Sequence, residues 1–143
     1  MLQLEEWTNR KVFNILFDSD IDNWSKDTSV FYQRIKNKEH IIIIIEDEEG
    51  NKFGGYVDSK IDKVGADDWI NDSKSFVFSL DQTDNCLFAF GYYGDICVHK
   101  ANYKTKSFCY QDSFEYEGIP NALCGKQHPY RFTPKRIIVI EMK

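Results

Sequence analysis

The chain has 143 residues, 42% of them hydrophobic and 15% aromatic, so it is long enough to bury the core of one domain and too apolar to be disordered. Its formal net charge of -5, without a run of basic residues, disfavours partners that are bound by neutralising phosphates, such as nucleic acids. The longest apolar run, residues 41–45, is far too short to cross a bilayer. We therefore expect a single domain over residues 1–143 without a transmembrane segment.

The cysteines indicate reduced thiols. They stand at 86, 97, 109 and 124, far from a Cys-x-x-Cys spacing and without a histidine at a paired ligand spacing, which disfavours zinc. No signal peptide opens the chain, so we expect a cytoplasmic protein. Cys86 and Cys97 lie in apolar strand patterns and are expected to be buried. Cys109 and Cys124 lie in segments that can be exposed, which leaves a redox role open for these two.

Strand patterns outnumber helix patterns along the chain. The elements expected in the first half are a short helix at 4–8, a strand at 11–17, a helix from 25 or 27 to about 37, and strands at 40–46 and 52–57. Ser25 or Asp27 can cap the second helix, in which Phe31 and Ile35 share one face. The strand at 40–46 is apolar on both faces, which predicts that it is covered on both sides.

The second half of the chain predicts strands only, at 75–80, 86–90, 95–99, 107–110, 114–118 and 136–142. The first two should form a hairpin, and Cys86, Phe88 and Phe90 are expected on one face of the second. The last strand alternates two apolar faces, with Ile137 and Val139 on one of them, and is predicted to be central. Seven or eight short strands with one or two helices predict an α+β fold, a two-sheet antiparallel β-sandwich with one or two flanking helices.

Residues 46–57, EDEEGNKFGGYV, combine acids, which are metal ligands, with glycines, which are typical of phosphate-binding loops. A phosphate site needs its glycines to open a helix after a strand, and here Gly54 and Gly55 lie inside an extended segment. Residues 47–51 instead have the composition of a hairpin turn, in which Gly50 or Asn51 can take a positive φ. The double glycine then indicates a bulge or a close approach of another backbone.

No pattern indicates catalysis, a cofactor or a metal. The histidines at 40, 99 and 128 lie far apart, and no nucleophile elbow is present. Asp18, Asp20 and Asp22 occupy the first three ligand positions of a calcium loop. Asn23 stands where that loop requires glycine, however, and Ser29 stands where it requires a bidentate glutamate. We expect a turn whose acids cap a helix, and a protein that is not an enzyme.

Aromatic residues and lysines gather in the loop-rich stretch 90–110. Most of these rings can pack against the core or the rim of the sandwich. The alternative is a protein-contact surface, because aromatic residues are enriched where interfaces are tightest. The candidate contact residues are Tyr92, Tyr93, Tyr103 and Lys104.

The order of these pieces resembles the TLDc domain, the module shared by oxidation-resistance proteins and their relatives. The matching stretches are FDSD (17–20), Phe31 with Tyr32, D-x-x-G (47–50), FGGYV (53–57), Trp69, FVFSL (76–80), NALCG (121–125) and FTPKRIIVIE (132–141). Together they cover nearly the whole chain. The resemblance implies a structural role for Phe53, Gly54, Gly55, Tyr56, Trp69 and Gly125. The terminal strand and residues 90–108 depart from the family's pattern.

The resemblance implies two antiparallel sheets flanked by helices, without a cofactor. It also implies a non-enzymatic protein-interaction module, since several relatives protect cells against oxidative damage and several bind the vacuolar proton-pumping ATPase. Such domains commonly form the C-terminal part of a longer protein, in the cytoplasm or at the cytosolic face of endomembranes. Two alternatives stay open, namely a stress-responsive scaffold or regulator with another partner, nuclear partners included, and a small redox enzyme that uses Cys109 or Cys124.

Overall fold

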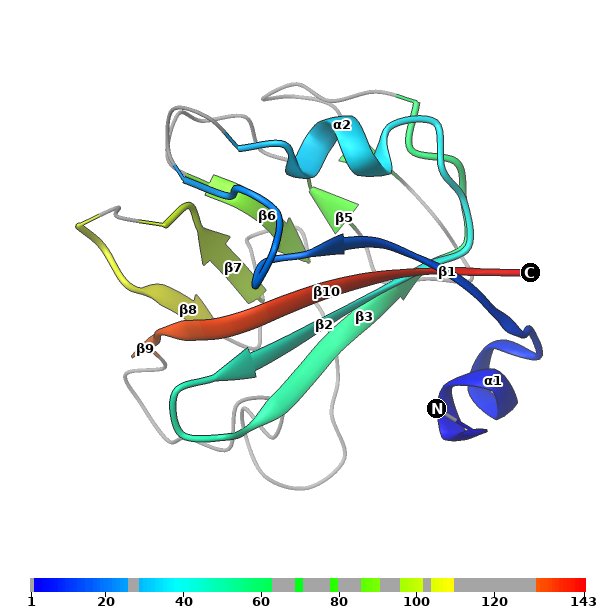
Figure 1. The fold of residues 1–143 in the computed structure, drawn as a ribbon, viewed down its shortest axis with the longest axis horizontal. Coiled ribbons are helices and arrows are strands. Elements are labelled where there is room, and N and C mark those ends of the chain that lie inside the picture. Colours follow the sequence, from blue (N-terminus) through cyan, green and yellow to red (C-terminus); the bar gives the residue numbers. More distant parts are fainter. Residues whose placement is uncertain are drawn as a thin grey trace.

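The computed structural model describes residues 2–25, 29–62, 69–70, 78–79, 86–90, 96–101, 104–109 and 131–143. These residues form a four-stranded and a six-stranded antiparallel sheet, with two short helices. Figure 1 shows the six-stranded sheet lying behind the four-stranded one, with α2 (Phe31–Ile35) across one end of the two layers. The predicted α+β sandwich is therefore confirmed.

The first sheet has the strand order β1-β10-β2-β3. Its strands are β1 (Val12–Asp18), β10 (Pro134–Met142), β2 (Ile41–Asp47) and β3 (Lys52–Val57). β10 pairs with β1 on one side and with β2 on the other, so the last strand is central, as predicted. The isoleucines of β2 alternate between the main core and a second cluster on the opposite face, so apolar side chains pack on both faces as predicted, although Ile44 on the outer face is only half-buried.

The second sheet runs in the order β4-β5-β6-β7-β8-β9. Its strands are β4 (Trp69–Ile70), β5 (Phe78–Ser79), β6 (Cys86–Phe90), β7 (Ile96–His99), β8 (Ser107–Cys109) and β9 (Arg131–Phe132). The pairing of Phe78 with Phe90 confirms the predicted hairpin. β4 and β9 were not expected, and the strand predicted at 114–118 lies outside the described residues.

β6 contains a bulge at its start, while the side chains of Cys86 and Phe90, expected on the same face as Phe88, lie outside the described part of the structure. The pairing with β7 shifts by one residue between Cys86 and Phe88, and Leu87 and Phe88 are both buried in the main core. Because a bulge inserts one unpaired residue, two successive side chains can turn to the same side. Leu87 thus joins the core from a position that alternation assigns to the other face.

The predicted helix from residue 25 or 27 to about 37 is much shorter in the structure. α2 begins after Val30, which makes no side-chain cap, and Ser25 lies instead in a bridge to Ala101. Asp27 lies outside the described residues. The helix ends early because the backbone N–H of Asn37 bonds to the carbonyl of Ile61 at 2.7 Å, with Asn37 at a φ of 62°. This bond takes the chain out of the helix.

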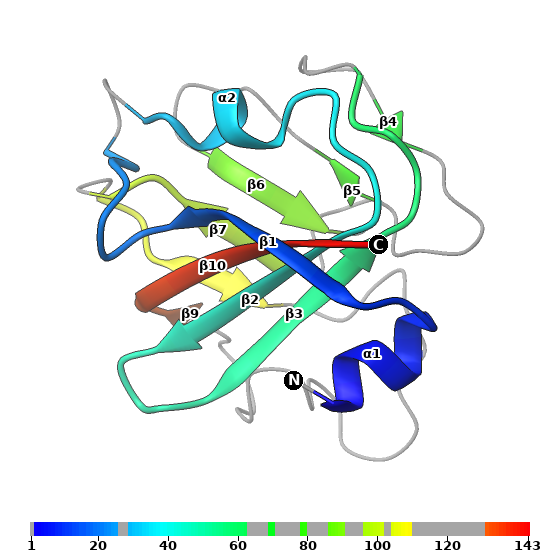
Figure 2. The same ribbon diagram turned by 45° about the vertical axis from the view of Figure 1, so that its right-hand side comes forward.

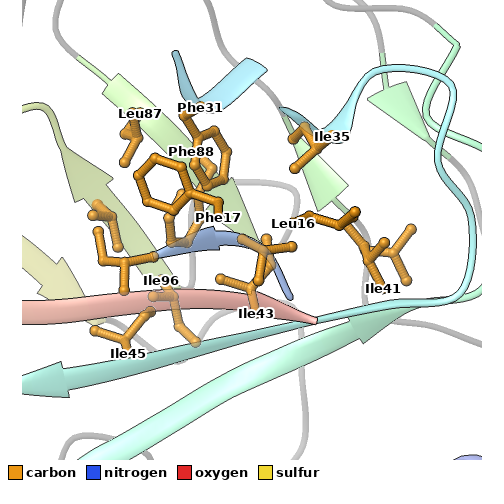
Figure 3. Packing of buried hydrophobic residues seen from close by; sticks show 14 of the residues in the cluster. Leu16, Phe17, Phe31, Ile35, Ile41, Ile43, Ile45, Leu87, Phe88 and Ile96 are labelled. Atoms are coloured by element: carbon orange, nitrogen blue, oxygen red, sulfur yellow. The ribbon is translucent and has the colours of Figure 1, made fainter. Parts of the chain in front are cut away.

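Three phenylalanines join the two sheets through α2. The ring of Phe17 on β1 meets the edge of Phe31 at 5.0 Å between centroids, and Phe31 stacks on Phe88 of β6 at 5.3 Å (Figure 3). Such ring pairs contribute about 0.5–1.5 kcal/mol each beyond the area that they bury. The predicted face of Phe31 and Ile35 is confirmed, since both side chains are fully buried in this cluster.

The acidic stretch between β2 and β3 is a hairpin turn organised by Asp47. This carboxylate is 1% exposed, and its Oδ1 accepts the backbone N–H groups of Glu49 and Asn51, each at 2.9 Å. Gly50 takes the positive φ, at 86°. The hairpin turn predicted for residues 47–51 is confirmed. The carboxylate of Asp47 stabilises this turn by accepting backbone hydrogen bonds.

The double glycine of β3 reflects a close backbone approach. The pairing of β2 with β3 has no register shift, which rules out a bulge within this strand. A Cβ atom on Gly54 would collide with the carbonyl oxygen of Ile43 and would lie 3.1 Å from the Cα of Ile44. There is consequently no space for a side chain at Gly54.

Candidate partner-binding surface

Most residues of the predicted aromatic contact surface lie outside the described part of the chain. Tyr92, Tyr93 and Tyr103 lie outside the described residues, whereas Lys104 is exposed just before β8. The surface therefore stays a prediction, and the described part of the chain offers other candidates.

The acidic turn after β1 is a set of ion pairs. Asp18 is buried, and Arg136 donates to both of its oxygens, from Nε at 3.0 Å and from Nη2 at 2.6 Å. These hydrogen bonds hold the pKa of Asp18 below its usual range. Asp20 also lies 3.1 Å from Arg136, and Asp22 pairs with Arg34 at 2.9 Å.

The turn's acids are thus engaged by arginines and by the backbone, as in a structural loop. Among the residues that the structure describes, no group of three or more His, Cys, Asp or Glu side chains could hold a metal ion.

The thiols of Cys97 and Cys109 are buried. Cys109 is 2% exposed and belongs to the main core, so of the two segments that could have been exposed, this one is buried. Cys97 is also buried, as predicted, with its Sγ 4.0 Å from Nε2 of His99. A buried thiol is shielded from oxidants in solution. Cys124 lies outside the described residues.

A polar cluster joins α1 (Leu2–Thr8) to the ends of β2 and β3. The hydroxyl of Tyr56 donates to Asp58 at 2.6 Å and accepts from Nε of Arg10 at 3.1 Å. Nδ1 of His40 lies 3.0 Å from the same oxygen of Asp58, which gives this histidine a structural role. Burial and the hydrogen bond to Asp58 raise the pKa of Tyr56 to about 12, so its hydroxyl remains a donor at neutral pH.

An apolar groove lies between α1 and the outer face of the first sheet, and we call it the α1 groove. Its volume is about 730 Å³, and its main lining residues are Leu4, Trp7, Ile42, Ile44, Gly54 and Tyr56. Figure 2 shows α1 beside this sheet, close to the start of β1 and to β3. Trp7 is 75% exposed and also lines a neighbouring pocket with Arg10 and Asp58. Because α1 is short, the sheet's outer face is only partly covered.

The sequence signal for this groove was weak. Leu4 and Trp7 are three residues apart, which is helical spacing, but this spacing alone does not say which surface the helix faces.

A family model for the TLDc domain matches residues 1–118. The chain belongs to the TLDc domain family. Among curated proteins, no match is found. The matched residues of this TLDc domain run from α1 beyond β8, while β9 and the central strand β10 follow them.

The residues expected to be structural in this TLDc domain can be followed where the structure describes them. Phe53 is buried and meets the ring of Phe132 edge-on at 5.0 Å. Gly54 lies against the backbone of Ile43, and Tyr56 bonds to Asp58 and Arg10. Trp69 is the first residue of β4. Gly125 lies outside the described residues. Neither α1 nor α2, the two helices of the described part, is long and apolar enough to cross a membrane.

Proposed function

We propose that this TLDc domain is a non-enzymatic protein-interaction module that acts in oxidative-stress resistance by regulating the vacuolar proton-pumping ATPase. Membership of the family, matched over residues 1–118, is the observation that carries the proposal. The half-covered outer face of the first sheet supports it, because exposed apolar surface with polar rims is typical of interaction sites. The proposed location is the cytoplasm, at the cytosolic face of endomembranes that carry the pump.

Affinity capture from cell extract, followed by mass spectrometry, tests the partner. The wild-type domain should enrich subunits of the vacuolar ATPase over an unrelated domain of similar size. Joint replacement of Tyr92 and Tyr93 by alanine should weaken this enrichment if the aromatic stretch is the contact surface. Ile21→Ala is the control, because Ile21 is an apolar residue that is 85% exposed and does not belong to the aromatic stretch 90–110 of the sequence. Absence of pump subunits would remove the vacuolar ATPase from the proposal.

The same experiment addresses the two alternatives. Enrichment of a different and reproducible partner set, nuclear proteins included, would favour a stress-responsive scaffold. The redox alternative now depends on Cys124, since Cys109 is buried. Peroxide consumption by the purified domain that disappears in Cys124→Ser would favour an enzyme.

A further inference from the structure

The strand β3 is an edge of the first sheet, and the direction of its backbone groups follows from the hairpin. The N–H of Asp47 bonds to the carbonyl of Asn51 at 3.0 Å, which makes this a hydrogen-bonded pair. Hydrogen-bonded and non-hydrogen-bonded pairs alternate along an antiparallel ladder. The backbone groups of Phe53 and Gly55 therefore face β2, and those of Lys52, Gly54 and Tyr56 face outward.

This outward row has no hydrogen-bond partner in the described part of the chain. Among the described residues, no hydrogen bond uses the backbone N–H or carbonyl groups that Lys52, Gly54 and Tyr56 direct away from β2. Each unpaired row of this kind is a template for a further extended chain.

The two edges of the first sheet differ in how they are protected. β1, at one edge, carries two register shifts along its pairing with β10, and such bulges discourage the addition of another strand. β3, at the other edge, pairs in regular register and contains no proline. Lys52 carries the sole charge on this strand. The β3 edge thus lacks most of the features that keep sheet edges from pairing.

The α1 groove adjoins the same edge. Gly54 is opposite Ile44 on the outer face of the sheet, and its part of the groove wall carries no side chain. An added strand would place the residue opposite Gly54 above this gap, next to Trp7. A groove of about 730 Å³ with an apolar floor favours a large apolar side chain there.

The charge of Lys52 favours a particular type of residue opposite it on an added strand. The side chain of Lys52 is 66% exposed, and its ammonium group lies 3.3 Å from a carboxylate oxygen of Glu46 on the neighbouring strand. A residue directly across from Lys52 on an added antiparallel strand would lie within reach of that ammonium group, and opposite charges stabilise such cross-strand pairs. The edge therefore favours a partner strand with an acid at this position.

We propose that the β3 edge binds an extended peptide segment of a partner protein by antiparallel strand addition, with a large apolar side chain opposite Gly54 and an acid opposite Lys52. Main-chain hydrogen bonds to Lys52, Gly54 and Tyr56 contribute the affinity for the peptide. The α1 groove contributes specificity, because it accommodates the apolar side chain opposite Gly54. The inference rests on the proposed function of partner binding, but it is independent of which protein the partner is.

The test uses a blocked nonapeptide, TSTVFTETS, whose fifth residue is placed opposite Gly54 and whose seventh is placed opposite Lys52. Binding is measured by fluorescence anisotropy, and the amide signal of Gly54 is followed by NMR. N-methylation of the fifth amide, which faces β3, should weaken binding by about tenfold or more. N-methylation of the fourth amide, which faces away, is the matched control and should leave binding within about twofold.

Replacing the fifth residue of the peptide by serine should also weaken binding by about tenfold. With the variant Lys52→Glu, lysine should become the preferred seventh residue. Equal effects of the two N-methyl groups, or no binding up to about 1 mM peptide, would overturn the proposal.

Lys52→Pro separates this inference from the proposed function. Proline is tolerated at an edge where the lost N–H faces outward, so the pairing with β2 should remain, and Lys52→Ala is its control. If the wild-type domain captures pump subunits but does not bind the peptide, the inference is wrong and the proposed function stands. If the wild-type domain binds the peptide but captures no pump subunits, the inference stands and the vacuolar ATPase is removed from the proposed function. A dimer that Lys52→Pro dissociates, with no peptide binding, would assign the edge to a second copy of the chain and also overturn the inference.

Discussion

Asp18 ties two distant parts of the chain together through one side chain. Its carboxylate is 7% exposed and takes a forked pair of hydrogen bonds from Arg136, which is 118 residues further along. A bidentate pair of this kind fixes orientation as well as distance. The end of β1 is thereby fastened to β10 beside the backbone bond from Ser19 to Ile137.

We expect the contribution of this pair to depend on pH. Because Arg136 lowers the pKa of Asp18 in the folded state, the pair stabilises the fold fully above the unfolded pKa of about 4. This stability is lost as the pH falls through the lower folded pKa. Asp18→Asn should therefore reduce the free energy of unfolding by about 2 kcal/mol near neutral pH and by clearly less near about pH 2. Urea denaturation across this range measures both values.

Glu46→Gln is the control for that experiment. Glu46 pairs with the exposed ammonium groups of Lys52 and Lys135, and surface pairs contribute about 0–1 kcal/mol. A loss in Asp18→Asn that is the same at both ends of the pH range would contradict the role assigned to the charge.

At the scale of the elements, β3 shows how one glycine sets the distance between two strands. Gly54 lies so close to the carbonyl of Ile43 that no side chain fits, although the register of the pair is regular. The strand on which the family resemblance is most recognisable is therefore also constrained by backbone packing.

Gly54→Val should lower the free energy of unfolding by about 2 kcal/mol or more, because β2 and β3 must separate to admit the side chain. For a domain of this length, such a loss corresponds to a fall of about 5 °C or more in Tm. Glu48→Gln should change Tm by less than about 1 °C, since Glu48 is exposed in the adjacent turn. Differential scanning calorimetry of the three proteins decides it, and an unchanged Tm for Gly54→Val would refute the close approach.

Elements with a strong pattern of their own were predictable. The strands expected at 40–46, 52–57 and 136–142 agree with β2, β3 and β10 to within two residues, because continuous β-branched or alternating residues determine them locally. The length of α2 was overestimated because a backbone hydrogen bond between Asn37 and Ile61 ends this helix, and a contact between residues 24 positions apart leaves no periodic signal. β4 and β9 are two residues long, too short to show a period.

The candidate site was less predictable than the fold. The identity of Gly54 and Tyr56 as notable residues could be inferred from the family resemblance, but their use could not. The α1 groove depends on how a short helix lies across a sheet, and the cluster of Arg10, His40 and Asp58 is assembled from three separate segments. Such arrangements are set by packing and have no signature in local sequence.

At the scale of the whole molecule, the two sheets share one core. The two faces of β10 contribute to different clusters, one in this core and one on the outer face of the first sheet. Ile137 and Val139 lie in the main cluster between the sheets, and Ile140 and Met142 lie in the cluster beneath α1. This central strand follows the residues matched by the family model. We therefore expect that the matched segment alone does not form the complete core of this domain.

A chain ended after Thr133 should fail to fold. The four buried side chains of β10 contribute on the order of 10 kcal/mol of burial, which is comparable to the whole stability of a domain. Removal of Lys143 alone is the control and should leave a cooperative unfolding transition. Near-ultraviolet circular dichroism and denaturant titration compare the two, and a cooperative transition in the shorter chain would count against a central role for β10.

The paired backbones of Lys11 and Lys143 also set how the molecule responds to force. Their N–H and carbonyl groups exchange bonds of 2.6 and 2.8 Å, so the two residues lie side by side at one end of β1 and β10. Tension applied between them acts along the inter-strand hydrogen bonds, which are perpendicular to the strands. We therefore expect the hydrogen bonds between β1 and β10 to break one after another, while β10 stays paired with β2 until β1 has separated.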